Sequence, residues 1–378
     1  MRLIRLKADL YGFLLGEEVR GRAGDLFLVF DDTAEAFLKT HYFEALKKHE
    51  ERHILRRLFR PYEGQPLENK SLLLFFGSAM GDTVVLLPVL RRLKELYPSS
   101  RLYITVRPFE RHFYYGVGEV SMLLNRVLNL RELPPVDYVV DFSGMAGDRD
   151  FLSMGMQEYY YKRLFLEPKE INPRHYKLPV NPKALEPVRE LVEKLREAKK
   201  PLLLVSPKSP AWVRRLPYSF LKELASLAED FTLLVAQPSE EKELTEAKLG
   251  RLGYRVLNPY MTHLDYFKAL IYLVDAVISV DTGTFHLAGS LEKPLVGIFN
   301  TFPCSHRNYY PRAVCYQVSY SSPLCTAPCL LSFVPATKEN PLGMCQPALI
   351  NKEAYRDAPP CMHTVRAEHV LKLLREVF

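Results

Sequence analysis

The sequence predicts an α/β protein with two Rossmann-like domains, each containing a parallel sheet, and a small N-terminal module. Three observations predict this class. The chain of 378 residues is too long for one ordinary core. From Ser71 onward, short apolar runs alternate with helical patterns in two successive arrays. Residues 1–65, which precede these arrays, have a different character, with short strand-like runs and turns.

The composition is that of a folded globular protein, with 48% hydrophobic and 25% charged residues. The N-terminal segment MRLIRLKADLYGF alternates charged and apolar residues and lacks a continuous apolar core, so we expect no signal peptide. The apolar stretch 267–280 is too short and too interrupted by charge to cross a bilayer. We therefore expect a cytoplasmic protein, and peripheral contact with the inner membrane face is an open alternative.

The formal charge of +7 favours anionic partners. Much of the excess lies in Lys47–Arg60, where helical spacing would bring His53, Arg56, Arg57 and Arg60 close together. Two interpretations stay open for this segment: a solvated helix face, or a surface for anionic acceptors or a membrane.

The N-terminal module, residues 1–65, is predicted to contain strands at Arg2–Leu6 and Leu26–Phe30 and a helix from Thr33. We predict that Pro61–Asn69 is a linker. Residues 66–180 form the first array. Its predicted elements are the strand SLLLFFG, the helix MGDTVVLLPVLRRLKELYP, and the strands RLYITVRP, RVLNL and VDYVVDFSG of one parallel sheet.

Residues 181–378 form the second array, which follows the proline-rich stretch 172–187. We predict helices at Glu186–Lys199 and from Tyr218. The predicted strands are PLLLVSP, FTLLVAQP, YRVLNP, AVISVD and PLVGIFN. Ligands of such sheets bind beyond the carboxyl ends of the strands, so candidate binding residues are expected there.

The most informative segment is AVISVDTGTFHLAG, in which an apolar strand ends at Asp281. A Thr282-Gly283-Thr284 turn follows, and a helix opens near His286. The unpaired main-chain N–H groups of a helix start attract anions, so diphosphate oxygens are natural ligands there. Gly283 would let a ligand approach the backbone closely.

Three motifs occur in the order of a known family. They are Asp281 to Ala288; the loop Gly77-Ser78-Ala79-Met80-Gly81-Asp82, followed by Pro88 and Tyr97-Pro98; and Ser206-Pro207-Lys208 with Arg214-Arg215-Leu216-Pro217. In these motifs the chain resembles the ADP-heptose lipopolysaccharide heptosyltransferases, glycosyltransferase family 9. The resemblance covers residues 71–378 and implies a GT-B fold, in which two Rossmann-like domains face each other.

The resemblance also implies roles for individual residues. Asp82, on an acceptor-side loop with Gly77 and Gly81, would be the general base that takes the proton from the acceptor hydroxyl. Positive charge would stabilise the leaving nucleoside diphosphate without an obligatory cofactor, and the anomeric carbon would be inverted. The donor-binding residues would be Ser206, Lys208, Arg214, Arg215, Asp281, Thr282, Gly283, Thr284 and His286.

Structural alternatives stand beside these roles. Asp82 could cap the helix that follows it. His286 could be packed within its helix, and Lys208 could be a surface charge. Where the family has Lys-x-Trp-Pro, this chain has Arg214-Arg215-Leu216-Pro217, so the cation that meets the phosphates is open. Phe299-Asn300-Thr301 replaces the family's Phe-Gly-Pro-Thr, which bears on the donor pocket.

All 6 cysteines lie between Cys304 and Cys361. Cys325, Cys329, Cys345 and Cys361 could give four thiolates to a structural zinc or iron ion, and some members of the family and its protein-heptosylating relatives carry a comparable cysteine finger. Disulfides and free thiols are the alternatives, and a cytoplasmic location disfavours disulfides. Cys304 and Cys315 lie outside this pattern and are expected to be bystanders.

The sequence therefore predicts an inverting glycosyltransferase that moves a sugar, heptose by resemblance, from a nucleotide-sugar donor such as ADP-heptose. The acceptor would be an anionic glycan, a lipid-linked glycan such as lipopolysaccharide, or a protein. One alternative is a non-catalytic nucleotide- or glycan-binding protein. Another is a phage-associated protein that modifies nucleic acid, although nucleic acid is not the expected partner.

Overall fold

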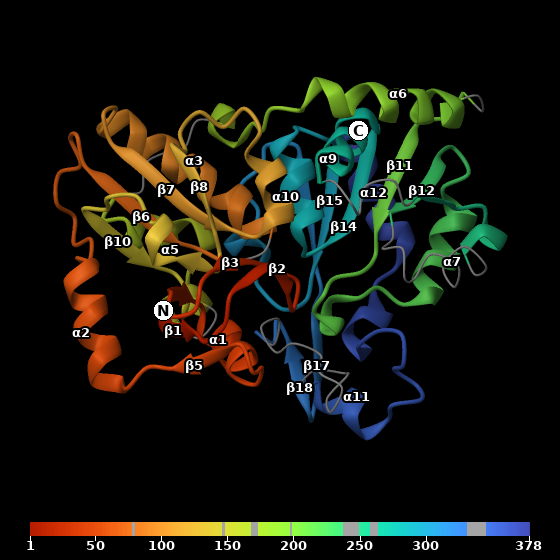
Figure 1. The fold of residues 1–378 in the computed structure, drawn as a ribbon. Coiled ribbons are helices and arrows are strands. Elements are labelled where there is room, and N and C mark those ends of the chain that lie inside the picture. Colours follow the sequence, from red (N-terminus) through yellow and green to blue (C-terminus); the bar gives the residue numbers. More distant parts are fainter. Residues whose placement is uncertain are drawn as a thin grey trace. The chain divides into compact units, whose positions relative to one another are not determined.

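The computed structural model describes residues 1–77, 80–145, 148–167, 173–196, 199–236, 249–257, 264–330 and 345–378 (Figure 1). The chain divides into two compact units. The first contains Met1–Ala79 and Leu86–Glu170, and the second contains Met80–Val85 and Ile171–Phe378. The predicted boundary between a module of residues 1–65 and a domain of residues 66–180 stays a prediction.

The first unit contains an antiparallel sheet of order β5-β1-β4-β9 and a separate β2-β3 hairpin. The predicted strands at Arg2–Leu6 and Leu26–Phe30 are confirmed as β1 and β4. Their alternating apolar residues, such as Leu28 and Phe30, pack with Leu73 and Phe75 of the next sheet in one core. The elements are β1 Arg2–Leu6, β2 Leu10–Leu14, β3 Glu17–Gly21, β4 Leu26–Val29, α1 Asp31–Leu38, β5 Phe43–Ala45 and α2 Lys48–Leu58.

A parallel sheet of order β10-β6-β7-β8 completes the first unit. Its strands are the buried apolar runs that the sequence indicates. The elements are β6 Ser71–Phe75, α3 Met80–Leu96, β7 Arg101–Val106, η1 Pro108–Tyr114, β8 Met122–Asn125, β9 Leu128–Asn129, η2 Leu130–Glu132, β10 Tyr138–Asp141, α4 Arg149–Ser153 and α5 Met156–Arg163.

The prediction that RVLNL belongs to the parallel sheet is wrong. Its strand, β9, pairs antiparallel with β4 of the N-terminal sheet, and β8 takes the expected place in the parallel sheet. Polar side chains explain why β9 pairs with the N-terminal sheet instead of the parallel sheet. Asn129 Nδ2 donates to Asp25 Oδ2 at 2.9 Å, and the Arg126 guanidinium binds Asp32 at 3.1 Å. These long-range bonds hold the segment to the N-terminal sheet.

The second unit is built on a six-stranded parallel sheet of order β13-β12-β11-β14-β15-β16. Helices cover both faces: α7 and α12 pack together, and so do α6, α9 and α10. The elements are η4 Pro173–Tyr176, α6 Pro182–Leu195, β11 Leu202–Ser206, η6 Trp212–Arg214, α7 Tyr218–Leu227, β12 Thr232–Ala236, η8 Gly250–Leu252, β13 Arg255–Leu257, α9 Leu264–Leu273, β14 Ala276–Val280, α10 Gly283–Ser290, β15 Leu295–Phe299, η9 Cys304–His306, β16 Ala313–Gln317, β17 Tyr320–Ser322, β18 Cys325–Ala327, α11 Gln346–Ile350, η11 Pro360–Thr364 and α12 Ala367–Val377.

Helix α6 differs from its predicted bounds of Glu186–Lys199. It begins earlier because Asn181 caps it by accepting a hydrogen bond from the Lys183 amide, and Pro182 fits the first turn. Within the described residues, no helix is both long enough and apolar enough to cross a membrane.

Candidate active site

The strand order of the second unit reverses between β11 and β14. The chain passes from β11 to β12 on one side and later returns to β14 on the other. Ligands of open parallel sheets bind outside the carboxyl ends of strands at such a point. Ser206 ends β11 there, and its hydroxyl donates to the Thr284 hydroxyl at the start of α10 over 3.2 Å. A side-chain hydrogen bond therefore joins the Ser206-Pro207-Lys208 motif to the motif that begins at Asp281.

Arg214 and Asp281 form the charged centre of this edge. The Arg214 guanidinium donates to the Asp281 carbonyl oxygen at 2.5 Å and lies 3.3 Å from its carboxylate. The Asp281 side chain is 4% exposed and that of Arg214 is 19% exposed. The pair fixes the guanidinium beside the predicted anion-binding turn while part of it stays open to solvent.

The first turn of α10 presents the expected bare amides. Thr282 precedes the helix with extended backbone, and its side chain makes no capping hydrogen bond. A Cβ on Gly283 would collide with the Met80 side chain, and one on Gly81 would lie 2.7 Å from the His286 ring. The first turn of α3, which groups with the second unit, therefore packs on the first turn of α10. Half-buried Asp82 is the next residue after Gly81.

His286 occupies a packed position in this arrangement. It is 2% exposed, and its Nδ1 lies 3.0 Å from the hydroxyl of buried Tyr310. Burial lowers the pKa of His286 to about 4, and the Arg307 and Arg214 charges act in the same direction against the opposing effect of Asp281. The ring is therefore neutral at neutral pH, which fits the packing alternative that the sequence left open.

The remaining predicted residues are placed as follows. Lys208 is half-buried in the loop after β11. Arg215 is half-buried too, with its Nε 3.5 Å from the Ser209 carbonyl oxygen. Gly77 lies in the first unit, where a Cβ would collide with the Phe30 ring, so close packing alone accounts for that glycine.

Three further buried polar residues lie in this region, and the sequence analysis named only Asn300 among them. Tyr310 holds His286, Asn300 holds the turn before Arg214, and Arg307 is 1% exposed with its guanidinium 3.8 Å from the centre of the Phe302 ring. Asn300 Nδ2 donates to the Val213 carbonyl oxygen at 2.7 Å. Asn300 stands at the departure from the family pattern that the sequence already indicated, whereas no sequence motif marked Tyr310 or Arg307.

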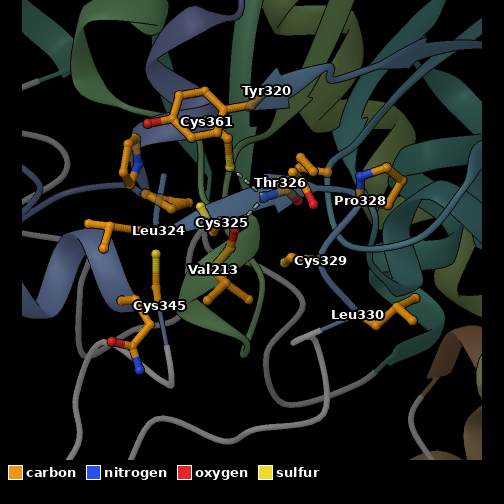
Figure 2. Close-up of a pocket in the computed structure, with 15 residues that line it drawn as sticks. Val213, Tyr320, Leu324, Cys325, Thr326, Pro328, Cys329, Leu330, Cys345 and Cys361 are labelled. Atoms are coloured by element: carbon orange, nitrogen blue, oxygen red, sulfur yellow. Dashed lines mark hydrogen bonds between the residues drawn. The ribbon is translucent and has the colours of Figure 1, made fainter. Parts of the chain in front are cut away.

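The four cysteines of the predicted metal site line one pocket of about 430 Å³ (Figure 2). They come from the β17-β18 hairpin, the residues after it, the start of α11 and η11. Burial raises the pKa of Cys361 to about 12, and the neighbouring cysteines act in the same direction. Burial also raises the pKa of Cys345. In the described part of the chain, no three His, Cys, Asp or Glu side chains are arranged to hold a metal ion.

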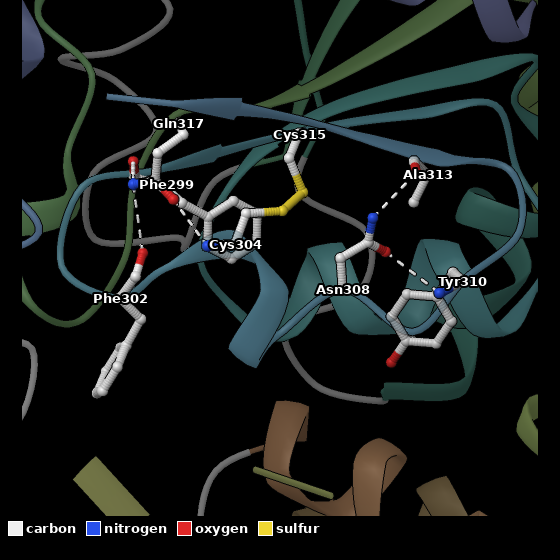
Figure 3. Close-up of a disulfide and its surroundings, with 8 residues drawn as sticks. All are labelled: Phe299, Phe302, Cys304, Asn308, Tyr310, Ala313, Cys315 and Gln317. Carbon is white, nitrogen blue, oxygen red and sulfur yellow. Dashed lines mark hydrogen bonds between the residues drawn. A yellow bond between two sulfur atoms is a disulfide. The ribbon is translucent and has the colours of Figure 1, made fainter. Parts of the chain in front are cut away.

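Cys304 and Cys315 form a disulfide, so the expectation that they are bystanders is wrong (Figure 3). The bond joins η9, after β15, to β16. Gln317 supports the same loop, because its side chain accepts from the Cys304 amide at 2.7 Å and donates to the Phe299 carbonyl oxygen at 3.0 Å. Spacing alone did not reveal the pair. Cys304 lies in η9 after β15, and the hydrogen bond from its amide to the Gln317 side chain holds η9 beside β16, which carries Cys315.

Residues 166–331 match the family model of glycosyltransferase family 9 (heptosyltransferase). The family 9 glycosyl transferase from Veillonella parvula DSM 2008 is 14% identical and has a TM-score of 0.61, with 83% of this chain and 100% of that chain covered. E. coli ADP-heptose lps heptosyltransferase II is 14% identical and has a TM-score of 0.59, with 82% of this chain and 98% of that chain covered.

The iron-containing dodecameric glycosyltransferase TibC from enterotoxigenic E. coli H10407 is also similar. It is 14% identical and has a TM-score of 0.56, with 83% of this chain and 80% of that chain covered. No curated protein sequence matches the chain. The match of residues 166–331 to the family model supports the predicted resemblance to glycosyltransferase family 9, and the similar solved structures confirm the predicted GT-B fold.

Proposed function

We propose that the protein is an inverting heptosyltransferase that uses a nucleotide-sugar donor, with ADP-heptose as the best candidate. The Arg214–Asp281 pair beside the first turn of α10 carries this proposal. A similar structure is that of E. coli ADP-heptose lps heptosyltransferase II, whose name gives ADP-heptose as its donor, and this supports the same donor here.

The donor diphosphate would lie in front of the α10 amides, between Thr282, Gly283 and Thr284. The amide N–H groups and the positive end of the helix favour the phosphate charge. Arg214 would stabilise the charge that grows on the leaving diphosphate, because a guanidinium binds phosphate oxygens strongly. Ser206, Lys208, Arg215 and His286 would shape this site, with neutral His286 positioning the turn through Tyr310.

Asp82 would be the general base on the acceptor side. In this step its carboxylate takes the proton from the acceptor hydroxyl as the hydroxyl oxygen bonds to the anomeric carbon. The bond from that carbon to the diphosphate oxygen breaks, and the nucleoside diphosphate leaves from the opposite face. The close packing of Gly81 on His286 supports this role, since it brings the first turn of α3 to the diphosphate turn.

The substitution Asp82→Asn tests the base against the capping alternative. Asn keeps the size and capping ability of Asp but cannot take a proton, so we expect turnover to fall by about 100-fold or more. ADP-heptose binding, measured by calorimetry, and the melting temperature should stay close to wild type. Turnover should be measured with ADP-heptose and a lipopolysaccharide core that lacks heptose. Full turnover by Asp82→Asn would remove Asp82 from the chemistry, whereas no binding of ADP-heptose would reject the donor.

The acceptor would be an anionic glycan, free, protein-borne or linked to lipid, because the chain is basic overall. The enzyme would then work in the cytoplasm, at the inner membrane face if the acceptor is lipid-linked. A panel of soluble and lipid-linked core glycans, compared by the initial rate of ADP release, would identify the preferred class.

We further propose that Cys325, Cys329, Cys345 and Cys361 hold a structural zinc or iron ion. All four line one pocket, and four sulfur ligands suit either metal. The raised pKa of Cys361 implies that binding must displace protons from the thiols. A bound ion would hold the β17-β18 hairpin to η11, and the transfer chemistry would not pass through it.

Elemental analysis of the purified protein tests this site. We expect about one metal ion per chain in the wild type, and its loss in Cys345→Ser/Cys361→Ser. The matched control is Cys304→Ser/Cys315→Ser, which also removes two cysteines but leaves the pocket unchanged. Metal-free wild-type protein, or equal metal loss in both variants, would count against the proposal.

A further inference from the structure

Helix α2 (Figure 1) binds β1 through both of its acidic residues. Glu51 is 8% exposed, and its Oε1 accepts from the Leu3 amide at 2.9 Å and from Arg2 Nε at 3.0 Å. Glu50 binds the Arg5 guanidinium at 2.6 Å. Both carboxylates of the helix are therefore used to fasten it to β1.

The outward face of α2 is left entirely cationic. Lys48, Arg52, Arg56 and Arg57 are exposed, and the structure gives none of them an ion pair or a side-chain hydrogen bond within the described residues. Lys48, Arg52 and Arg56 repeat at four-residue spacing, which places like charges side by side and destabilises a helix. Exposed His49, His53 and Arg60 extend the same basic surface.

The apolar residues around this face favour a lipid surface over a nucleic acid. Proteins that hold single strands stack bases chiefly on exposed Phe, Tyr and Trp rings, but the Phe59 ring at the C-terminal cap of this helix is 5% exposed. Leu58 is 41% exposed beside Arg57. A helix with several cations and an exposed aliphatic residue is typical of binding to anionic headgroups.

We propose that the outward face of α2, defined by Lys48, Arg52, Arg56 and Arg57, docks on the anionic headgroups of a phospholipid bilayer. This surface lies in the N-terminal segment that the family match does not include. The inference depends neither on the donor nor on Asp82.

Co-sedimentation of the full chain with vesicles tests the surface. Wild-type protein should bind vesicles of phosphatidylcholine mixed with phosphatidylglycerol, should not bind phosphatidylcholine alone, and should dissociate as salt is raised. Arg52→Glu/Arg56→Glu should lower the partition coefficient by about 30-fold or more, because each basic residue near such a surface contributes about fivefold. The milder Arg52→Gln/Arg56→Gln should lose less, with the melting temperature unchanged in both variants.

The matched control is Lys183→Glu/Lys194→Glu on α6, which makes the same change in net charge on an exposed helix that also carries acidic residues. Its vesicle binding should match wild type. Equal loss in the control would show that net charge alone is responsible and would overturn the proposal. Binding to neutral vesicles, or tight binding to RNA without binding to anionic vesicles, would overturn it as well.

Discussion

The two candidate sites of the second unit hold their buried polar groups in opposite ways. At the carboxyl end of β14, charge is paired: Arg214 binds Asp281, and the ring of His286 is held neutral against Tyr310. In the cysteine pocket after β15, the groups are thiols, and burial raises the pKa of Cys345 and Cys361. The first region is held together by its own side chains, whereas the thiols of the second would be cross-linked only by the metal ion proposed above.

One residue belongs to both regions. Asn300 follows β15 and is 1% exposed. Its Nδ2 donates to the Val213 carbonyl oxygen at 2.7 Å and lies 3.3 Å from Cys361 Sγ. Val213 directly precedes Arg214, so a change in the cysteine pocket can reach the charged pair through one amide.

The largest effect is expected from Asp281→Ala in the charged region. This substitution leaves Arg214 without its carboxylate in a mostly buried place, which costs about 3 kcal/mol of unfolding free energy. Loss of the fixed guanidinium should also weaken ADP-heptose binding by more than about tenfold. Urea unfolding and calorimetry measure both effects. Glu50→Ala, which breaks the exposed pair with Arg5, is the control and should change neither by much.

His286 should make stability depend on pH. Its pKa in the folded protein is about 4, below the ordinary value of 6.5, so the unfolded chain binds the proton more tightly between these values. Above pH 6.5 the His286 ring is neutral in both the folded and the unfolded chain, and its contribution to the free energy of unfolding is complete. It should fall by about 3 kcal/mol as pH drops toward 4. Urea unfolding across this range should show a shallower decline for His286→Gln than for wild type, and parallel curves would contradict the prediction.

The sequence was most informative where short-range patterns carry the structure. Apolar runs located the strands, and the strand, turn and helix around Asp281 and Gly283 were recognisable because each element follows its own periodicity. The sequence also placed Cys325, Cys329, Cys345 and Cys361 in one group, and the structure brings all four to one pocket. These predictions needed only local rules or clustering.

These local rules could not predict contacts between side chains that lie far apart in the sequence. Tyr310 meets His286 across 24 positions, and Asn300 meets Cys361 across 61. Such pairs depend on the order of strands in the sheet, which periodicity does not encode. The same cause explains the misplacement of RVLNL, because its place depends on which strand lies beside which.

Gly289→Ala should test how tightly the charged region is packed. A Cβ at this position would run into the Tyr310 ring, the partner of His286, so the ring must move. Overpacking of this kind costs about 2 kcal/mol. The melting temperature should fall, and the pH dependence assigned to His286 should weaken with it. Gly250→Ala, where a Cβ meets nothing within 4 Å, is the control and should leave both measurements unchanged.

The smallest effect, and the sharpest test of the link between the two regions, is expected from Asn300→Ala. It removes hydrogen bonds to Val213 and Cys361 and should cost about 1 kcal/mol of unfolding free energy. If Asn300 positions the turn that carries Arg214, ADP-heptose should bind several-fold more weakly as well. Asn129→Ala removes a comparable buried amide in the first unit and should lower stability without changing donor affinity. Equal donor affinity in both variants would mean that the cysteine pocket and the charged pair are independent neighbours.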